Sequence, residues 1–369
     1  MSKKTKATTD FNLYVGGKTG AFKGVKVDYN GIIVKNLQNV EILKPESEIS
    51  FLSWNENKEC DILIGTVNQT VKIYDIEFKA YSTSFEAKFG TGPIVGFARV
   101  NGAVTTCSGS GHIKVWKYKK NEQIQFSVGG EVSRMKEFYQ KEGVIGLGGN
   151  KNDFKIWDIE RKEKIFCAKN VKKDMLELEV PIWVTDLTFL PDSEYKVAVS
   201  TRHGQVRLYD TKAQRRPVID INIENQSLNT ITLCHNNNQV IVGSTTGHLM
   251  MADLRGKGKI LHRYKGPVGS VRQVAAHPKL PYFASVGLDR YMRIHHTESR
   301  RLLFERYLKV RLNTVLMSSK FGKDLEKLDQ SDDDDIECVD LEGENEFNEI
   351  FDNMETVRSE PQKKKKKIQ

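Results

Sequence analysis

The sequence contains only five cysteines, and no two of them lie close together in the chain. This excludes a zinc site of the CxxC type and gives no sign of a disulfide framework. There is also no run of 18 apolar residues, so no transmembrane helix is expected. No apolar stretch follows the lysine-rich start at Met1–Lys6, so no secretory signal is expected either. We therefore expect a protein of a reducing compartment, the cytosol or the nucleus.

Motifs for catalysis are missing as well, since the sequence has no GxSxG nucleophile elbow and no phosphate-binding loop. The glycine-rich stretch Gly146–Gly149 ends a predicted strand and leads into a turn, which favours a structural role. His295 and His296 would face opposite sides of a regular strand, so this pair cannot hold one metal ion. We expect one of the two histidines to be packed and the other exposed. The prediction is a protein that is not an enzyme and has no metal site or cofactor.

The charge is distributed unevenly along the 369 residues. The net charge is +9, but residues 323–360 carry 16 acidic and 3 basic side chains, and residues 361–369 carry five lysines. This leaves +17 for residues 1–322. A basic body of this kind indicates nucleic acid or an acidic assembly as the partner.

A strand-like run that ends near an aromatic and an acidic residue recurs along the chain every 41 to 52 residues. This period is typical of the WD repeat, in which each repeat forms one four-stranded blade of a β-propeller. The copies are Phe22–Asp28, Thr70–Asp75, His112–Lys117, Phe154–Asp158, Gln205–Asp210, His248–Asp253 and Tyr291–His296. The aspartates Asp75, Asp158, Asp210 and Asp253 occupy equivalent points of separate repeats, which predicts strand-end caps rather than a catalytic set.

The first repeat lacks the innermost strand that the other repeats have. A run of the right pattern, Leu312–Met317, occurs instead near the other end, after a predicted outer strand at Leu302–Tyr307. We therefore predict an all-β fold, a seven-bladed WD-repeat β-propeller over residues 12–319 that is closed by a C-terminal strand. Residues 1–11 are predicted to be a flexible basic N-terminus, and residues 320–369 a disordered acidic tail that ends in a lysine run.

Basic residues cluster in the connections that follow successive repeats. Because the clusters recur at similar points of the repeats, we expect them to share one rim of the ring and to bind RNA phosphates or a partner. The candidate residues are Lys169, Lys172, Lys173, Arg215, Arg216, Arg255, Lys257, Arg300 and Arg301. The first three lie in an insertion at residues 168–181 that makes its repeat about nine residues longer than its neighbours.

A second basic feature is the lysine run near the end of the sequence. Compact cationic runs are typical of nuclear or nucleolar targeting signals. The candidate targeting residues are Lys363, Lys364, Lys365, Lys366 and Lys367.

Several stretches are not generic features of propellers. They include Ala168–Asp174, Val180–Trp183 and Gln214–Val218, together with Gly269–Arg272 and Gly287–Arg290. On these residues the chain resembles the WD repeat-containing protein 74 family over residues 12–317. That family comprises nucleolar WD-repeat proteins of large ribosomal subunit assembly.

The resemblance implies a non-enzymatic scaffold of large (60S) ribosomal subunit biogenesis and pre-rRNA processing, located in the nucleus and nucleolus. Its implied partner is the pre-60S particle, with pre-rRNA and other assembly factors. It also implies release by an AAA-type ATPase and a link to an exosome-associated RNA helicase. On this interpretation the protein is a monomer within a large complex, with no membrane contact.

Another class of function remains open from the residues alone. A nuclear WD-repeat module could recognise substrates for a ubiquitin ligase or read chromatin, for which an aromatic or acidic cleft would be expected. The net basic body favours the assembly scaffold over this alternative. A propeller enzyme would need acids, histidines or metal ligands that converge near the ring axis, and the sequence shows no such set.

Overall fold

The computed structural model describes residues 10–322 except 29–30, 40–42, 57–58, 117–123, 139 and 174. In this part of the chain the strands form seven four-stranded antiparallel sheets. From the innermost strand outward, blade 1 consists of β28 (Leu312–Met317), β1 (Leu13–Gly17), β2 (Phe22–Asp28) and β3 (Gly31–Asn36). Blade 2 consists of β4 (Ile49–Trp54), β5 (Asp61–Thr66), β6 (Thr70–Asp75) and β7 (Ala80–Glu86). Blade 3 consists of β8 (Ile94–Val100), β9 (Ala103–Ser108), β10 (His112–Trp116) and β11 (Gln125–Ser127). A short 3-10 helix, η2 (Pro45–Ser47), precedes β4.

The other four blades have the same order. Blade 4 consists of β12 (Arg134–Glu137), β13 (Val144–Gly149), β14 (Asn152–Asp158) and β15 (Glu163–Cys167), and blade 5 of β16 (Val184–Phe189), β17 (Lys196–Thr201), β18 (Gln205–Asp210) and β19 (Ile219–Asn222). Blade 6 consists of β20 (Leu228–Leu233), β21 (Gln239–Ser244), β22 (Leu249–Asp253) and β23 (Lys259–Tyr264). Blade 7 consists of β24 (Val271–Ala276), β25 (Tyr282–Gly287), β26 (Tyr291–His296) and β27 (Leu302–Tyr307).

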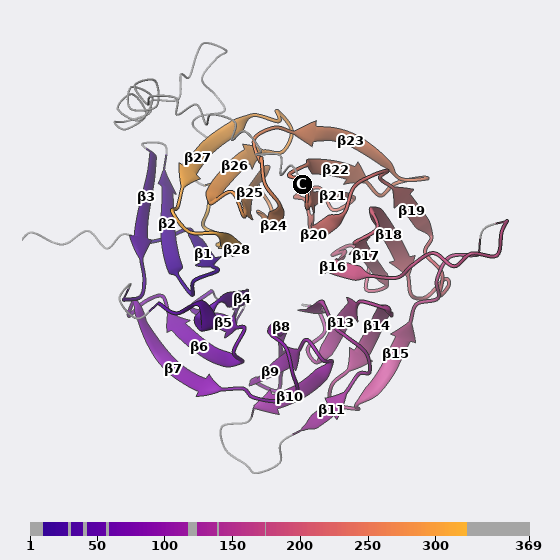
Figure 1. Ribbon diagram of the computed structural model, residues 1–369, viewed down its shortest axis with the longest axis horizontal. Helices are drawn as coiled ribbons and strands as arrows, with labels where there is room; N and C mark the ends of the chain where they lie inside the picture. The colour runs from indigo at the N-terminus through magenta and orange to yellow at the C-terminus, as the bar shows by residue number, and fades with distance from the viewer. Residues whose placement is uncertain are drawn as a thin grey trace, which may run out of the picture. The chain divides into compact units, whose positions relative to one another are not determined.

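The seven sheets stand around a common axis like the blades of a propeller (Figure 1). The innermost strands contact one another in the order β28, β4, β8, β12, β16, β20 and β24, and β24 contacts β28 again. The prediction of an all-β, seven-bladed WD-repeat β-propeller is therefore confirmed. Among the residues described, no helix has the length and apolar character needed to span a membrane.

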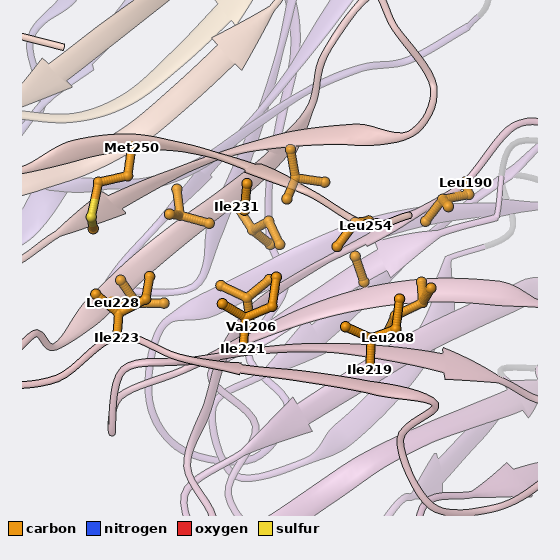
Figure 2. Packing of buried hydrophobic residues seen from close by; sticks show 14 residues of the cluster. Leu190, Val206, Leu208, Ile219, Ile221, Ile223, Leu228, Ile231, Met250 and Leu254 are labelled. Carbon is orange, nitrogen blue, oxygen red and sulfur yellow. The ribbon is translucent and has the colours of Figure 1, made fainter. Parts of the chain in front are cut away.

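The core lies between neighbouring blades rather than at the ring axis. Figure 2 shows the cluster between blades 5 and 6, which includes Val206 and Leu208 of β18, Ile231 of β20 and Met250 of β22. Apolar residues alternate along these strands, so each sheet presents a row of aliphatic side chains to its neighbour. Tight turns join the strands. In the turn between β17 and β18, Gly204 has a φ of +83°, and a Cβ there would lie 2.5 Å from the Ile223 carbonyl oxygen.

Ring closure depends on the strand at the end of the described chain. β28 pairs antiparallel with β1, in a register that places Val315 opposite Val15. The Asn313 side chain donates a hydrogen bond to the Ile49 carbonyl oxygen (3.1 Å), across the junction to blade 2. The side chains of Ser50 and Asn229 make the same type of bond from their own inner strands to the first residue of the next one. Blade 1 is therefore joined to blade 2 in the same way as blades that are continuous in the sequence.

The packed part of the chain extends past both ends of the predicted ring. Phe11, in the segment predicted to be flexible, is buried and its ring meets Tyr14 edge-on. Phe321, in the segment predicted to be tail, is fully buried and contacts Tyr282. A single aromatic residue outside a repeat has no periodic pattern, so neither position could be recognised from the sequence. The remainder of the predicted tail, including Lys363–Lys367, lies outside the described residues.

The repeat aspartates are local caps, as predicted. Asp158 and Asp210 each accept hydrogen bonds from two backbone N–H groups of the turn that follows the strand, at 3.0–3.2 Å. Asp75 accepts one from Phe78, and Asp253 accepts one from Arg255. These turns connect the third and fourth strands of separate blades. Among the described residues, no group of three or more His, Cys, Asp or Glu side chains is placed to hold a metal ion.

Both residues of the histidine pair are buried, so the expectation of one exposed histidine is wrong. They lie on β26, the third strand of blade 7, and packed residues cover both faces of this strand. Nε2 of His295 lies 2.8 Å from the Lys265 carbonyl oxygen, and its ring stacks on Phe283. Nδ1 of His296 accepts a hydrogen bond from the Ser299 amide (3.0 Å). Side chains do alternate between the two faces of β26, but both faces are packed and neither is exposed to solvent.

The burial of His295 predicts a specific sensitivity to acid. Burial lowers the pKa of His295 to about 4, from 6.5. The folded ring favours the neutral imidazole, so protonation of His295 in the unfolded chain lowers the free energy of unfolding. This loss is absent above pH 6.5 and grows as the pH drops toward 4. From pH 7 to pH 5 this group should remove about 2 kcal/mol of unfolding free energy. The test measures the unfolding free energy by urea denaturation at both pH values. Between pH 7 and pH 5, the His295→Gln variant should lose about 2 kcal/mol less of this free energy than the wild type.

The matched control is His203→Gln, at an exposed position. It should keep the pH dependence of the wild type. Burial raises the pKa of Glu137 to about 7, which acts in the opposite direction but equally in all three proteins. If His295→Gln and the wild type lose the same free energy between pH 7 and pH 5, His295 does not titrate as described.

Candidate partner-binding surfaces

The strand directions define two rims of the ring. Neighbouring strands in a blade are antiparallel, so connections from the third to the fourth strand of each blade emerge on one side. We call this side the turn rim. Connections from one blade to the next emerge on the opposite side, which we call the linker rim. Arg215, Arg216, Arg255 and Lys257 lie in turn-rim connections, as do Arg300 and Arg301 in blade 7.

The insertion begins as a blade-to-blade connection, but its base contacts a turn-rim loop. The amide of Lys169 donates a hydrogen bond to the Arg215 carbonyl oxygen (2.9 Å). In return, Nε of Arg215 donates to the Cys167 carbonyl oxygen (2.8 Å), and Nε of Arg216 donates to that of Asn170 (3.3 Å). Three hydrogen bonds thereby join residues that are 46 to 48 positions apart in the sequence.

A buried arginine contacts the base of the insertion through a hydrogen bond. Arg207 of β18 is 2% exposed, lies 3.4 Å from the Asp220 carboxylate, and donates to Oδ1 of Asn170 (3.4 Å). The Asn170 amide in turn donates to the Val180 carbonyl oxygen (2.7 Å), which draws the two ends of the insertion together. Figure 1 shows the segment between them extending outward from the ring near β18 and β19.

The outer part of the insertion is exposed. Lys172 and Lys173 are exposed, and Nζ of Lys173 lies 3.1 Å from a Glu179 carboxylate oxygen. The apolar side chains of Met175 and Leu176 are also exposed, at 102% and 78%. The insertion thus has a rigid base and an accessible tip that carries both basic and apolar side chains.

A groove of about 560 Å³ adjoins the anchored loop. One wall is β15 with Lys164 and Phe166, and the other is the loop with Lys212 and Arg215. The sequence analysis did not single out Lys164 or Lys212, because Lys164 lies on the outer strand β15 and Lys212 in a turn, where exposed lysines are common. Their position on facing walls of one groove follows only from the packing of blade 4 against blade 5.

The remaining candidates are placed one and two blades further along the turn rim. Arg255 donates from Nε and Nη2 to the Asp253 carboxylate, at 2.6–3.0 Å. These hydrogen bonds hold the pKa of the Asp253 carboxyl below its usual range. Lys257 and Arg300 are exposed, and Glu298, two positions before Arg300, lies 3.3 Å from Nε2 of His235. The structure therefore brings Lys169, Arg215 and Arg216 together, and leaves the others as separate small groups.

A seven-bladed ring built from this repeat places the chain among the WD-repeat β-propeller proteins. No family model matches the sequence. The chain is 37% identical over 84% of its length to WD repeat-containing protein 74 of Bos taurus, and equally to that of Homo sapiens, covering 81% of each relative. It therefore belongs to the WD repeat-containing protein 74 family. It is also 25% identical over 88% of its length to the ribosome biogenesis protein nsa1 of Schizosaccharomyces pombe, of which it covers 87%.

Proposed function

We propose that this protein is a non-enzymatic scaffold in the assembly of the large ribosomal subunit, and that it binds pre-ribosomal particles in the nucleolus. The names of its fungal relatives, which are ribosome biogenesis proteins, support this proposal. The observation that carries it is the anchored cluster of Lys169, Arg215 and Arg216 beside a groove with two further lysines. A rigid ring that presents basic side chains at a fixed spacing suits a structured, negatively charged partner.

Ribosomal RNA is the partner that this cluster suits. Nε of Arg215 bonds to the last residue of β15 and Nε of Arg216 to the insertion, so each guanidinium is held in place through Nε. Guanidinium groups bind phosphate oxygens in pairs of parallel hydrogen bonds, which rewards such a fixed orientation. The net charge of +17 on residues 1–322 would draw RNA toward the ring from a distance.

The finer parts of the proposal follow from the family. We propose that the protein contacts pre-rRNA and other assembly factors, that an AAA-type ATPase releases it, and that an exosome-associated RNA helicase acts at the same step. Lys363–Lys367 are proposed to direct it to the nucleus and nucleolus. These residues lie outside the part of the chain that the structure describes.

Sedimentation tests the proposal directly. In a sucrose gradient of nuclear extract, the protein should migrate with a large pre-ribosomal particle, and RNase treatment should shift it to light fractions. Migration as a small complex with and without RNase would favour the alternative, a substrate-recognition or chromatin-reader module.

The role of the anchored arginines gives a quantitative prediction. Binding to single-stranded RNA through about five phosphates should give a slope near −3.5 in a plot of log affinity against log salt concentration. Replacing both Arg215 and Arg216 by Ala should flatten this slope by about 1.4, at about 0.7 per phosphate contact. The slope is measured by fluorescence anisotropy with a labelled oligouridine at several salt concentrations.

Two controls separate charge from structure. Asn170→Ala removes the contact between the insertion and Arg207 without a change in charge, so the slope should stay unchanged. Replacing both Arg255 and Lys257 by Ala removes the same charge from the next blade, and should flatten the slope less. An affinity that does not depend on salt would contradict phosphate binding.

A further inference from the structure

The linker rim has a basic pocket of its own, on the opposite side of the ring from Arg215 and Arg216. The pocket has a volume of about 440 Å³ and lies where blade 7 meets blade 1. Its walls contain four basic side chains and one acidic side chain. The residues that line it are Lys18, Thr19, Pro45, Glu48, Arg290, Lys309, Val310 and Arg311.

The basic side chains are held on a rigid frame. The amide of Lys18 donates a hydrogen bond to the Arg311 carbonyl oxygen (2.8 Å), which ties the turn after β1 to the linker before β28. Nζ of Lys23 donates to the Leu308 carbonyl oxygen (2.8 Å), and Nη1 of Arg290 donates to the Tyr307 hydroxyl (3.0 Å). The shape of the pocket is therefore fixed before any ligand arrives.

The one acidic side chain that lines the pocket does not neutralise its four basic side chains. Its single acid, Glu48, accepts a hydrogen bond from the Asn313 side chain (2.7 Å). In the part of the chain that the structure describes, no ion pair within 4 Å involves Lys18, Lys309 or Arg311. Burial lowers the pKa of nearby Lys23, and the charge of Lys309 lowers it further. A negatively charged ligand would relieve this repulsion.

Three more arginines extend the positive region from the pocket toward the ring axis. Arg272, on β24, is half-buried, and its guanidinium makes no hydrogen bond or ion pair among the described residues. Burial lowers its pKa, Glu48 raises it, and the guanidinium groups of Arg202 and Arg134 lower it. Arg202 donates to Oδ1 of Asn229 (2.6 Å), and Asn229 bonds to the Val271 carbonyl oxygen, so Arg202 is held beside β24.

Arg134, on β12, is the third of these arginines. Its side chain is 14% exposed and lies over the Phe51 ring, with 5.1 Å between the guanidinium carbon and the ring centre. Its Nε is buried without a hydrogen-bond partner, at 3.6 Å from the Asp186 carboxylate. The guanidinium groups near the axis are therefore partly buried, so a ligand has to extend inward to reach them.

We propose that this region of the linker rim binds an acidic segment of a partner protein, with carboxylates entering the pocket between Lys18, Lys309 and Arg311. The partly buried guanidinium groups suit aspartate and glutamate side chains, which reach inward from a peptide backbone. The lining of the pocket itself contains Pro45 and Val310 and no aromatic ring, so RNA bases have no ring to stack on inside it. The two rims then have separate tasks, with RNA on the turn rim and a protein on the linker rim.

The test uses the full-length protein and a fluorescein-labelled peptide of twelve alternating Glu and Ala residues. Anisotropy at about 50 mM salt, where the Debye length exceeds 10 Å, gives its Kd. The double variant Lys309→Asn with Arg311→Gln should raise this Kd at least tenfold. Asn is chosen because Lys309 has a φ of +65°, which asparagine adopts more readily than most residues. Lys18→Gln alone is a second variant that leaves that backbone untouched, and should raise the Kd about threefold.

The control is Arg255→Gln with Lys257→Gln, which removes two charges from the turn rim and should leave the peptide Kd within twofold. Oligouridine affinity should be the same for the linker-rim double variant and the wild type. Absence of peptide binding, or equal binding by all variants, overturns the proposal. A linker-rim variant that loses oligouridine but not peptide would show that phosphate is the ligand. The proposed scaffold function would stand in either case, because it rests on the turn rim and on sedimentation.

Discussion

Deletion of Leu312–Met317 should abolish the cooperative unfolding transition of the ring. Without β28, β1 loses its inner neighbour, and the buried side chains of Leu312, Val315 and Met317 are removed. Burial of three such side chains contributes about 5–9 kcal/mol. This is comparable to the whole stability of a typical domain. Thermal unfolding followed by circular dichroism should therefore show no sharp midpoint at the wild-type temperature.

A deletion of similar size outside the ring is the control. Truncation after Pro361 removes eight residues beyond the described part of the chain, and should leave the midpoint unchanged. The single change Asn313→Ala is an intermediate case, since it removes only the bonds to Glu48 and to the Ile49 carbonyl oxygen. A sharp, unshifted transition after deletion of Leu312–Met317 would sink the closure model.

Asp186→Ala is expected to cost about 3–5 kcal/mol of unfolding free energy. Asp186 on β16 is 1% exposed and lies 2.9 Å from Nζ of Lys136 and 3.6 Å from Nε of Arg134, both on β12. It also accepts hydrogen bonds from the Thr230 hydroxyl and the Ile231 amide of β20, each at 3.1 Å. One carboxylate thus connects three successive blades. Its loss would leave two enclosed cations without a counter-charge and two donors without an acceptor.

Urea denaturation measures this loss, and two further variants test its cause. Asp192→Ala, at an exposed position, should change the unfolding free energy by no more than about 0.5 kcal/mol. The double change Asp186→Leu with Lys136→Met removes both charges of the closest pair, and should recover part of the loss. A cost below about 1 kcal/mol for Asp186→Ala would mean that water or movement of Lys136 compensates for the missing carboxylate.

Much of the architecture was predictable because each blade repeats the same physical pattern. β28 and β27 have the bounds predicted for the closing strand and for the outer strand before it. Alternation with a period of two marks each strand, and the turn residues between runs mark its ends. The absence of one inner strand from the first repeat was enough to predict closure.

The binding surfaces were less predictable, for a reason that lies in the ring itself. The basic residues of the linker-rim pocket come from positions 18, 290, 309 and 311, and only closure brings the first and last repeats together. The turn-rim prediction used residues close together in sequence, so it found Arg215 and Arg216 but not Lys164 across the groove. The prediction for His295 and His296 was wrong because packed residues cover both faces of β26, so neither face of this strand is exposed to solvent.

The position of the closing strand also sets the order in which the protein can fold on the ribosome that makes it. β1, β2 and β3 are synthesised first, but the inner partner of β1 is among the last described residues to emerge. Until then, the nascent chain carries an unpaired β-edge at one end of a growing row of blades. Such an edge can pair with any other exposed strand. A slow stretch of translation before residue 317 would therefore prolong the period in which this chain is most prone to aggregate.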